Sequence, residues 1–385
     1  MDFTIPDELR MVKNLVRQFV QEEVIPLETE YREADGDEDL PGEVRDRLQT
    51  KLRDLGLWAL AVPKEYGGAG LGCLGMCLVT EETHRSILSR TLIGGGADPR
   101  LFAASDYLKE KYLYPTLRGE ISGRGAFSEP GAGSDLAGIQ TTAERDGDEY
   151  IINGTKIWQS QKGNYTVVLA RMKGTQRRDG MTRFIVDDET PGFQISRTVP
   201  LMGHKTTAEL VFDNCRVPAT HRLTQEGEAW ASAQLSLNKT RVYVAARCLG
   251  MASRCIEMAV DYAKVRHTFG EPLSNRQGVQ FMLADAAIGL HATRMMMYHT
   301  ACKVDNGEDI RHEASMLKVF STEMGFNAVD SAMQIHGAAG YSKEMPIESF
   351  FRTIRAARIY EGPNEVHRYV VARNLFRGYA GLDTT

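Results

Sequence analysis

The chain has 385 residues, of which 42% are hydrophobic and 25% are charged, and its formal net charge is −5. A chain of this length exceeds one ordinary hydrophobic core, so we expect two or three subdomains. The slight negative charge, with no basic stripe or arm, argues against nucleic acid as the main partner. No apolar run approaches the ~20 residues that a membrane span requires.

Cysteine usage and the first residues indicate the compartment. None of the six cysteines lies in a C-x-x-C pair, which indicates a reducing environment and no structural zinc. The nine histidines form no H-E-x-x-H or comparable cluster, so metal catalysis has no support. The N-terminus becomes acidic within a few residues, unlike a secretory or transit peptide. We therefore expect a cytoplasmic protein.

The first third of the chain is predicted to be helical. Apolar residues recur at helical spacing over residues 7–33, with charged residues between them. Further helical patterns cover residues 41–56, 74–88 and 99–118. These segments predict an N-terminal α-helical domain over residues 1–122.

The pattern changes to β structure in the middle of the chain. Residues 141–213 alternate polar and apolar side chains and are rich in β-branched and aromatic residues. Asp146-Gly147-Asp148 and Asn153-Gly154 are turn signals between the runs. Because the connections are too short for β-α-β crossovers, we predict an antiparallel β domain over residues 123–228.

Long helical patterns return in the last third. They lie near residues 229–267, 275–304, 310–338, 346–360 and 364–376. Helices of this length pack as a bundle, so residues 229–385 are predicted to form a helical bundle domain. The expected fold class is α+β, with the β domain inserted between two helical domains.

Residues 70–75 match the G-x-G-x-x-G pattern of dinucleotide-binding folds. That pattern needs a strand before it and a helix after it in a β-α-β unit. Here a turn rich in glycine and proline precedes the glycines, and the surroundings are helical. We predict a connection between helices at this place, without a Rossmann fold.

Residues 126–135 read Ala-Phe-Ser-Glu-Pro-Gly-Ala-Gly-Ser-Asp. The glycines and the proline force an irregular turn with little side-chain bulk, so that a large flat ligand can approach the backbone. Ser128 and Ser134 offer hydroxyls, and Asp135 is expected to cap the next element. The stretch resembles the flavin-contacting signature of the acyl-CoA dehydrogenases. The helical, β, helical order is also that family's architecture, and the resemblance spans essentially the whole chain.

The resemblance implies an FAD cofactor whose contacts begin in the β domain. The matching positions of the signature are Phe127, Ser128, Gly133 and Ser134. Trp158 is a core residue by ordinary expectation, but the family's matching tryptophan lies against the isoalloxazine ring. Ser160 matches a threonine that bonds near the reactive flavin nitrogen.

Other flavin contacts are implied across a subunit interface, in a homotetramer built as a dimer of dimers. A charged residue at a helix end is usually a solvated cap, whereas the family's matching residues hold the pyrophosphate of a neighbouring subunit. Those positions are Arg266, Thr268, Phe269 and Gln277. The adenosine half is expected near Gln334, Gly337 and Ala338, where alanine replaces a common glycine. Pro363 and Glu365 stand near the positions where many relatives have Thr-x-Gln, and Asn364 is expected to cap the last helix.

Glu361 is the candidate base. The helix before it must stop at Gly362-Pro363, because proline cannot continue a helix. On the sequence alone a surface carboxylate is favoured, but one branch of the family places its catalytic glutamate immediately before this glycine. The resemblance implies that Glu361 removes the α-proton of an acyl thioester and that a β-hydride passes to the flavin. Substrate contacts are implied at Ser134, Asn238, Arg241, Gly362 and Arg373.

The leading hypothesis is therefore an FAD-dependent acyl-CoA dehydrogenase that forms a trans-2-enoyl-CoA and passes electrons to an electron-transfer flavoprotein. An acyl-CoA oxidase or an enoyl-CoA reductase of the same fold is the alternative. Glu361 weighs against a monooxygenase, which often lacks the base, and against a nitroalkane oxidase, which uses aspartate. A cofactor-free helical interaction module is the hypothesis from another class. The acyl pocket is expected near residues 80–105 and 235–250, where the glycine-rich residues 93–99 are a flexible loop or admit a polar acyl group.

Overall fold

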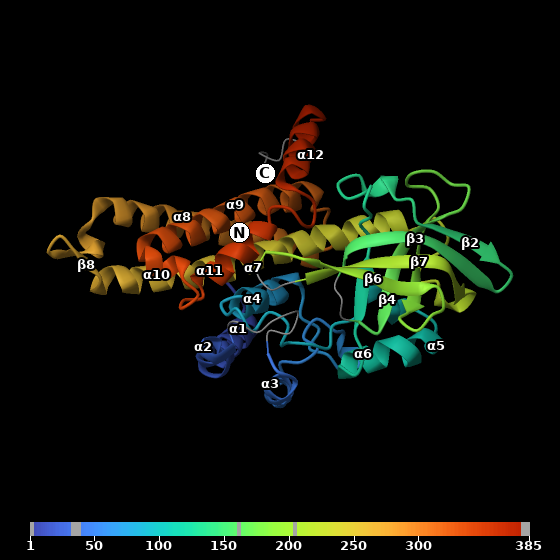
Figure 1. Cartoon of the computed structure of the whole chain (residues 1–385), viewed down its shortest axis with the longest axis horizontal. Helices are drawn as coiled ribbons and strands as arrows, with labels where there is room; N and C mark the ends of the chain where they lie inside the picture. The colour runs from blue at the N-terminus through green and yellow to red at the C-terminus, as the bar shows by residue number, and fades with distance from the viewer. Residues whose placement is uncertain (1–3, 32–39, 160–162, 203–205, 379–385) are drawn as a thin grey trace.

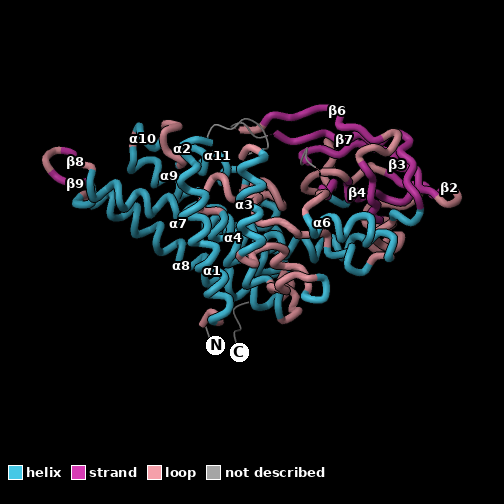
Figure 2. Tube along the Cα trace, turned by 90° about the horizontal axis from the view of Figure 1, so that it is seen from below, coloured by secondary structure: helices cyan, strands magenta, loops and turns pink. Residues whose placement is uncertain are grey.

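The computed structural model describes residues 4–31, 40–159, 163–202 and 206–378. Helices, a sheet and further helices follow one another along the chain, which confirms the predicted order (Figure 1). The helices gather on one side of the molecule and the strands of the large sheet on the other (Figure 2).

The N-terminal region is helical but more interrupted than predicted. Its first helical stretch comprises α1 (Asp7–Phe19), a π-helical turn (Val20–Val24), a 3-10 turn (Ile25–Leu27) and α2 (Glu28–Tyr31). The helices α3 (Gly42–Asp54) and α4 (Cys73–Thr83) follow.

The predicted helix over 99–118 is confirmed in part: the segment is helical in four pieces, with a break at residues 104 and 105 and an unbroken run from Asp106 to Arg118. They are a 3-10 turn (Pro99–Ala103), α5 (Asp106–Leu108), a π turn (Lys109–Leu113) and α6 (Tyr114–Arg118). The side chain of Asp98 accepts a hydrogen bond from the Arg100 N–H, and the Ser105 hydroxyl accepts one from the Leu108 N–H. Each of these caps begins a new turn, so side-chain capping divides what periodicity alone reads as one helix.

The large sheet runs in the order β1-β4-β2-β3-β7-β6, with β5 paired to β4. Its strands are β1 (Gly123–Ala126), β2 (Thr142–Asp146), β3 (Glu149–Gln159), β4 (Tyr165–Met172), β5 (Met181–Asp187), β6 (Phe193–Pro200) and β7 (Thr206–Pro218). Most pairs are antiparallel, as predicted, but β4 lies parallel to both β1 and β2. The two strands share one edge of β4 while β5 covers the other. In the sequence β2 and β3 lie between β1 and β4, and β3 lies between β2 and β4. The parallel pairs therefore form without a helical crossover.

The C-terminal helices pack into a bundle beside the sheet. They are α7 (Ala229–Val265), α8 (Gln277–Asp305), α9 (Arg311–His336), α11 (Ile347–Ala356) and α12 (Asn364–Phe376), with a short α10 (Ala338–Tyr341). A small hairpin of β8 (His267–Thr268) and β9 (Glu271–Pro272) joins α7 to α8 at the far end of the bundle (Figure 1). Gly250 of α7 lies so close to α4 that an added Cβ would stand 2.2 Å from the Glu81 carbonyl oxygen.

The two helical regions share one hydrophobic core. That core joins buried residues of α1, α3 and α4 to those of α7, α8, α9 and α11. The sheet has its own core between β1, β3, β4, β5 and β7. The fragmented segment after Pro99 packs on the sheet, through Leu101, Leu108 and Leu113 against Tyr165 and Ile185. The β region is thus attached to a helical body built from both ends of the chain.

The glycine-rich residues 70–75 form a turn into α4, as predicted. A 3-10 turn (Lys64–Tyr66), not a strand, precedes them. The carboxylate of Asp305, the last residue of α8, accepts hydrogen bonds from the N–H groups of Cys73 (2.5 Å) and Leu74 (3.0 Å). An added Cβ on Gly72 would stand 2.6 Å from the Asp305 carboxylate oxygen Oδ1. The missing side chain at Gly72 therefore lets α8 cap the N-terminus of α4.

Replacing Asp305 with Ala should remove this cap and destabilise the protein by about 1–2 kcal/mol, the usual effect of losing an N-terminal cap. Hydrogen exchange at the amides of Cys73 and Leu74 should accelerate. Asp309→Ala is the matched control, because Asp309 bonds only to the nearby Arg311. Unchanged exchange at both amides in D305A would contradict the role of Asp305.

Candidate active site

The turn of residues 126–135 follows β1 and is closed by its own backbone. The N–H of Glu129 donates to the Ala132 carbonyl (3.0 Å), and the Ala132 N–H donates back to Glu129 (3.1 Å). A Cβ built on Gly131 or Gly133 would meet no atom within 4 Å. The outer side of the turn is therefore open backbone, on which a flat group could lie.

A buried ion pair holds this turn against β3. The ammonium of Lys156 donates to the Glu129 carboxylate (2.8 Å) and to the Phe127 carbonyl (3.0 Å). The same carboxylate accepts from the N–H groups of Gln140 (2.5 Å) and Thr141 (2.9 Å). Burial would raise the pKa of Glu129, but the Lys156 charge and these hydrogen bonds outweigh it and lower that pKa. The Glu129 side chain and the Phe127 carbonyl thus tie the turn to β3 and to the backbone of residues 140 and 141.

Trp158 projects out of the sheet. The Ile157 N–H donates to the Ser128 carbonyl (2.9 Å), which joins β3 to the turn. The register of β3 then shifts between Lys156 and Gln159, and Trp158 adopts a φ of 67°. Its side chain is 56% exposed between buried neighbours. The ordinary expectation of a core tryptophan is therefore wrong, and an aromatic face stands beside the open turn. Ser160 lies outside the described residues.

Asp135 does not act as the predicted cap. Its side chain makes no hydrogen bond to the following 3-10 turn (Leu136–Gly138). It instead accepts a hydrogen bond from Arg177 (2.9 Å). Ser134 next to it is exposed.

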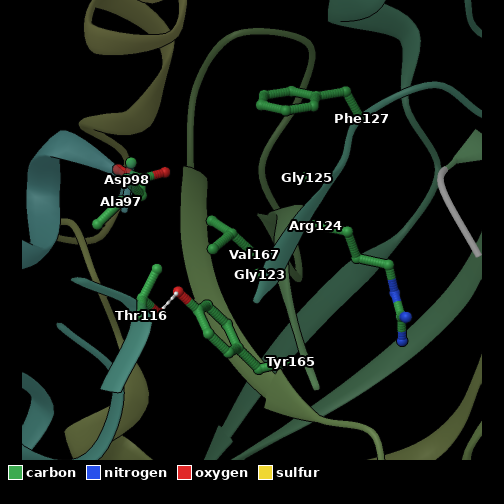
Figure 3. Close-up of a pocket in the computed structure, with 10 residues that line it drawn as sticks. Ala97, Asp98, Thr116, Gly123, Arg124, Gly125, Phe127, Tyr165 and Val167 are labelled. Carbon is green, nitrogen blue, oxygen red and sulfur yellow. Dashed lines mark hydrogen bonds between the residues drawn. The ribbon is translucent and has the colours of Figure 1, made fainter. Parts of the chain in front are cut away.

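A cavity of about 210 Å³ lies behind Phe127. Figure 3 shows Phe127 and Tyr165 on either side of Val167, with a hydrogen bond joining the hydroxyls of Tyr165 and Thr116. The guanidinium carbon of Arg183 stands 4.9 Å from the centre of the Phe127 ring. Gly96, Ala97 and Asp98 line the cavity, so part of the glycine-rich segment 93–99 does face a hollow space. Gly94 and Gly95 of that segment lie against the Trp58 ring, where an added Cβ would clash.

The residues assigned to the other half of the flavin site lie at the far end of the bundle. Arg266, Phe269 and Gln277 are exposed around the β8–β9 hairpin, and Phe269 is fully exposed with a φ of 51°. Thr268 accepts a hydrogen bond from Arg276 (2.6 Å) through its carbonyl. Figure 1 shows this tip and the sheet at opposite ends of the molecule. One chain therefore does not bring these residues to the turn and Trp158.

The segment after α9 is at the same end of the bundle. Gln334, Gly337 and Ala338 are exposed, and Gly337 has a φ of 59°. Tyr341 is also largely exposed. Exposed aromatic and polar groups thus surround the tip in a single chain.

Glu361 occupies a strained turn between α11 and α12. Its φ is 56°, a conformation that costs a non-glycine residue about 1–3 kcal/mol, and Gly362 follows with a φ of 90°. Arg241 (3.1 Å) and His367 (3.0 Å) approach the Glu361 carbonyl with side-chain nitrogens. Lys318 donates to the Gly362 carbonyl (2.6 Å). Three side chains from three helices therefore hold this turn.

Asn364 does not cap α12 as predicted. Its side chain makes no hydrogen bond to the first turn of that helix. It is buried and accepts a hydrogen bond from Lys318 (2.9 Å), while its amide donates to Thr322 (3.0 Å). Asn364 therefore joins the turn to α9. Pro363 stands at the N-terminal boundary of the helix, and Glu365 is exposed.

The Glu361 carboxylate has a raised pKa. Burial is the main cause, and the charges of Arg247, Arg241 and Lys318 partly oppose it. Its oxygen Oε2 is buried and has no hydrogen-bond partner among the described residues. A buried carboxylate without a partner is a costly arrangement for folding and a useful one for a proton acceptor. The surface interpretation favoured by sequence alone is therefore wrong.

Of the residues expected to contact the substrate, Arg241 and Asn238 lie close to the Glu361 turn. Asn238 is buried and accepts a hydrogen bond from Arg241 (2.5 Å). Burial lowers the pKa of Arg241. Arg373 lies on α12, and its guanidinium carbon is 5.7 Å from the centre of the Tyr369 ring. Arg241 thus faces Glu361, whereas Arg373 lies on the outer helix.

Sequence reasoning missed Lys318, Arg247 and His367. Burial lowers the pKa of Lys318 to about 8 and that of His367 to about 4. One signal was available, because Lys318 interrupts an apolar run between Leu317 and Val319. A buried lysine at such a place needs polar partners, and the carbonyl of Gly362 and the side chain of Asn364 supply them.

The turn fits a flat aromatic cofactor such as a flavin. Open glycine backbone lies beside an exposed tryptophan, and Ser128 and Ser134 supply hydroxyls. Such a surface suits stacking and hydrogen bonding to a planar ring system.

Among the described residues, no group of His, Cys, Asp and Glu could hold a metal ion. No described helix is long and apolar enough to cross a membrane.

Comparison with known proteins identifies the family. The N-terminal, middle and C-terminal domain models of acyl-CoA dehydrogenase match residues 6–120, 125–215 and 227–376. The (R)-benzylsuccinyl-CoA dehydrogenase of Thauera aromatica is 36% identical, with 97% of each chain covered. The 3-(aryl)acrylate reductase of Clostridium sporogenes is 35% identical, covering 98% of this chain and all of the relative. Butyryl-CoA dehydrogenase of Megasphaera elsdenii has a solved structure with a TM-score of 0.87 at 31% identity, over 98% and 100% of the two chains. The chain belongs to the acyl-CoA dehydrogenase family and is an FAD-dependent oxidoreductase.

Replacing Lys156 with Met should leave the Glu129 carboxylate buried without its counter-charge, which destabilises a protein by about 3–5 kcal/mol. We expect a lower unfolding temperature and a reduced FAD content after purification. Lys173→Met is the control, because its ion pair with Glu144 is exposed and should contribute little. Equal unfolding temperatures for the two variants would show that the buried pair does not hold the turn.

Proposed function

We propose that this protein oxidises an acyl-CoA thioester to a trans-2-enoyl-CoA, with Glu361 as the base that removes the α-proton. The observation that carries this proposal is the buried Glu361 oxygen without a partner, at a turn held by Arg241, Lys318 and His367. The relatives named as acyl-CoA dehydrogenases support the reaction class. FAD, when bound, accepts the hydride that leaves the β-carbon.

The pKa of Glu361 suits proton abstraction. An α-proton of a thioester is weakly acidic, so a base that is poorly solvated is stronger than a carboxylate in water. Burial raises the pKa of Glu361, while the nearby cations keep the rise from becoming extreme. A carboxylate with a raised pKa binds a proton more tightly than one in water, which suits a proton acceptor.

The backbone of the turn serves a second purpose. Among the described residues, the Glu361 N–H donates no hydrogen bond to another backbone group. Side chains hold the carbonyls of Glu361 and Gly362, so the two peptides that follow the Glu361 Cα are fixed in orientation. This N–H can donate to the thioester oxygen as negative charge develops there. Substrate contacts at Gly362, Asn238 and Arg241 would follow from the same turn, with Ser134 and Arg373 farther out.

We also propose that two chains complete each flavin site. Phe127, Ser128, Gly133, Ser134, Trp158 and Ser160 would form one part. The second part would come from a neighbouring chain, through Arg266, Thr268, Phe269, Gln277, Gln334, Gly337 and Ala338. The full exposure of Phe269 at the tip of the bundle supports this arrangement, because a partner would cover it. A homotetramer of two such dimers is the proposed assembly, with Pro363 and Glu365 near the cofactor.

The direction of the reaction and the electron acceptor define the second candidate function. A relative named as a 3-(aryl)acrylate reductase shares 35% identity along almost the whole chain. The same base could return a proton to the α-carbon in an enoyl-CoA reductase. We favour dehydrogenation with an electron-transfer flavoprotein as acceptor. Slow reoxidation of the reduced enzyme by oxygen is the expected outcome, and fast reoxidation would indicate an oxidase instead. The hypothesis of a cofactor-free interaction module is wrong, because the chain is a member of a flavoenzyme family.

Replacing Glu361 with Gln should leave the protein yellow but abolish anaerobic bleaching by acyl-CoA, because an amide cannot accept the proton. Glu361→Asp is the matched variant and should bleach slowly, since it retains a displaced carboxylate. The measurement is flavin absorbance after anaerobic mixing. Near-normal bleaching by E361Q would end the assignment of the base.

The raised pKa of Glu361 also predicts a pH dependence. The ordinary pKa of glutamate is about 4.3, and kcat/KM should rise with pH through a higher value as the base ionises. A carboxylate with a raised folded-state pKa destabilises the folded state above the ordinary pKa. E361Q should therefore unfold at a higher temperature than the wild type at neutral pH. The difference should vanish below about pH 4. An advantage that grows on acidification would contradict the shift.

A further inference from the structure

Arg183 is a fully buried cation next to the turn of residues 126–135. It lies on β5, its side chain is 2% exposed, and its guanidinium carbon stands 4.9 Å from the centre of the Phe127 ring. Side chains alternate between the two faces of a strand, so Arg183 shares a face with Met181. Met181 packs with Ala132 of the turn in one buried apolar cluster. The charge of Arg183 therefore lies on the buried side of this turn.

The Asp98 carboxylate is shared by two arginines. It accepts hydrogen bonds from the Arg100 guanidinium (2.8 and 3.1 Å), while its oxygen Oδ2 stands 3.8 Å from Nη1 of Arg183. Arg100 also donates to the Ser232 carbonyl (3.1 Å) and to the Ser236 hydroxyl (3.0 Å) of α7. No other carboxylate in the described part of the chain forms an ion pair with either arginine. Two cations and one anion leave this group with a net positive charge.

Hydrogen bonds compensate little of the Arg183 charge. Its nitrogens Nε and Nη2 are buried and have no hydrogen-bond partner among the described residues. Burial, together with the charge of Arg100, lowers the pKa of Arg183 to about 10, and Asp98 opposes this change. The guanidinium therefore stays protonated at neutral pH. The residues that line the cavity beside Asp98 and Phe127 do not include Arg183, so a ligand in that cavity would not neutralise it by contact.

We propose that Arg183 raises the reduction potential of the bound flavin by stabilising the negative charge of its reduced form. The inference rests on the proposed function, because it needs the flavin to lie on the 126–135 turn. In the proposed reaction the α-proton passes to Glu361, a hydride leaves the β-carbon, and the C=C bond forms between the two carbons. The hydride carries two electrons and one proton, so a neutral flavin that accepts it becomes an anion. A buried cation lowers the energy of that anion, because a low-dielectric interior screens charges weakly.

A raised potential bears on the direction of the reaction. It makes hydride transfer from an acyl-CoA to the flavin more favourable, and the reduction of an enoyl-CoA by the flavin less favourable by the same factor. Arg183 therefore favours dehydrogenation over the enoyl-CoA reductase that is the second candidate function. Arg183 needs no contact with the reacting atoms in this role, because it acts through its charge behind Phe127.

The test measures the midpoint potential of FAD in the holoenzyme, by titration with dithionite against reference dyes and without acyl-CoA. R183M should shift the equilibrium about tenfold towards oxidised flavin, which is about 30 mV for a two-electron couple. D98N should shift it in the opposite direction, since it leaves both arginines without a carboxylate. Arg177→Met is the matched control, because Arg177 lies beside the same turn but is exposed and paired with Asp135, and it should change the potential little. An unchanged potential in R183M or in D98N would overturn the inference.

A charge-conserving variant separates electrostatics from structure. R183K keeps the charge and should stay near the wild-type potential, so a fall as large as that of R183M would overturn the inference. A shift of R183M and D98N in the same direction would show a disturbed turn and would also overturn it. If R183M does not hold FAD, D98N decides, and a potential at or below that of the wild type overturns the inference. Because the titration contains no acyl-CoA, the expected shifts without any bleaching by acyl-CoA would count against the proposed function alone.

Discussion

The buried ion pair between Glu129 and Lys156 is the constraint on which the cofactor side of the site depends. It joins the turn after β1 to the hairpin strand β3, and the carboxylate also binds the backbone of residues 140 and 141. Unfolded segments rich in glycine have high conformational entropy, so an open turn of this kind needs contacts from outside the turn to keep it ordered. Because the Glu129–Lys156 ion pair lies on the inner side of the turn, the outer backbone stays free of side chains. Glu129 of the 126–135 turn therefore fixes the shape of the turn from its inner side.

The substrate side of the site, at Glu361, has the opposite arrangement of hydrogen-bond partners. At Glu361 the backbone is held by partners while the carboxylate is left without one. The strain of its positive φ is offset by hydrogen bonds from α7, α9 and α12. Two acidic residues thus serve different purposes because their partners differ. Glu129 is neutralised and rigid, whereas Glu361 keeps an unused oxygen in a cationic environment.

Long periodic patterns made the bundle and the order of the regions predictable. The helix predicted over 229–267 is observed as Ala229–Val265, because a repeating apolar face needs no tertiary information. The helix predicted over 99–118 is broken after Ala103, since capping by Asp98 and Ser105 is a local choice that periodicity does not detect. The parallel edge of β4 depends on long-range pairing, which short connections alone did not reveal.

The site could be predicted only where a motif carried it. The turn at 126–135 and the break at Gly362-Pro363 have local signatures. Arg247 has none, and Lys318 only the interruption of an apolar run, because each lies within a helix and gains its role from segments far along the chain. Asp135 and Asn364 were assigned as caps from their residue type, but Arg177 and Lys318 are stronger partners for them.

The shared helical core has a consequence for how the chain folds during synthesis. Its first helices bury their apolar faces against α7, α8, α9 and α11, which the ribosome makes last. The sheet between them has a core of its own and can fold as soon as it emerges. Until the C-terminal helices arrive, the first third of the chain must expose the residues that later join it to them. We therefore expect folding at the ribosome to start with the sheet, while the N-terminal helices wait for the C-terminal ones that complete their core.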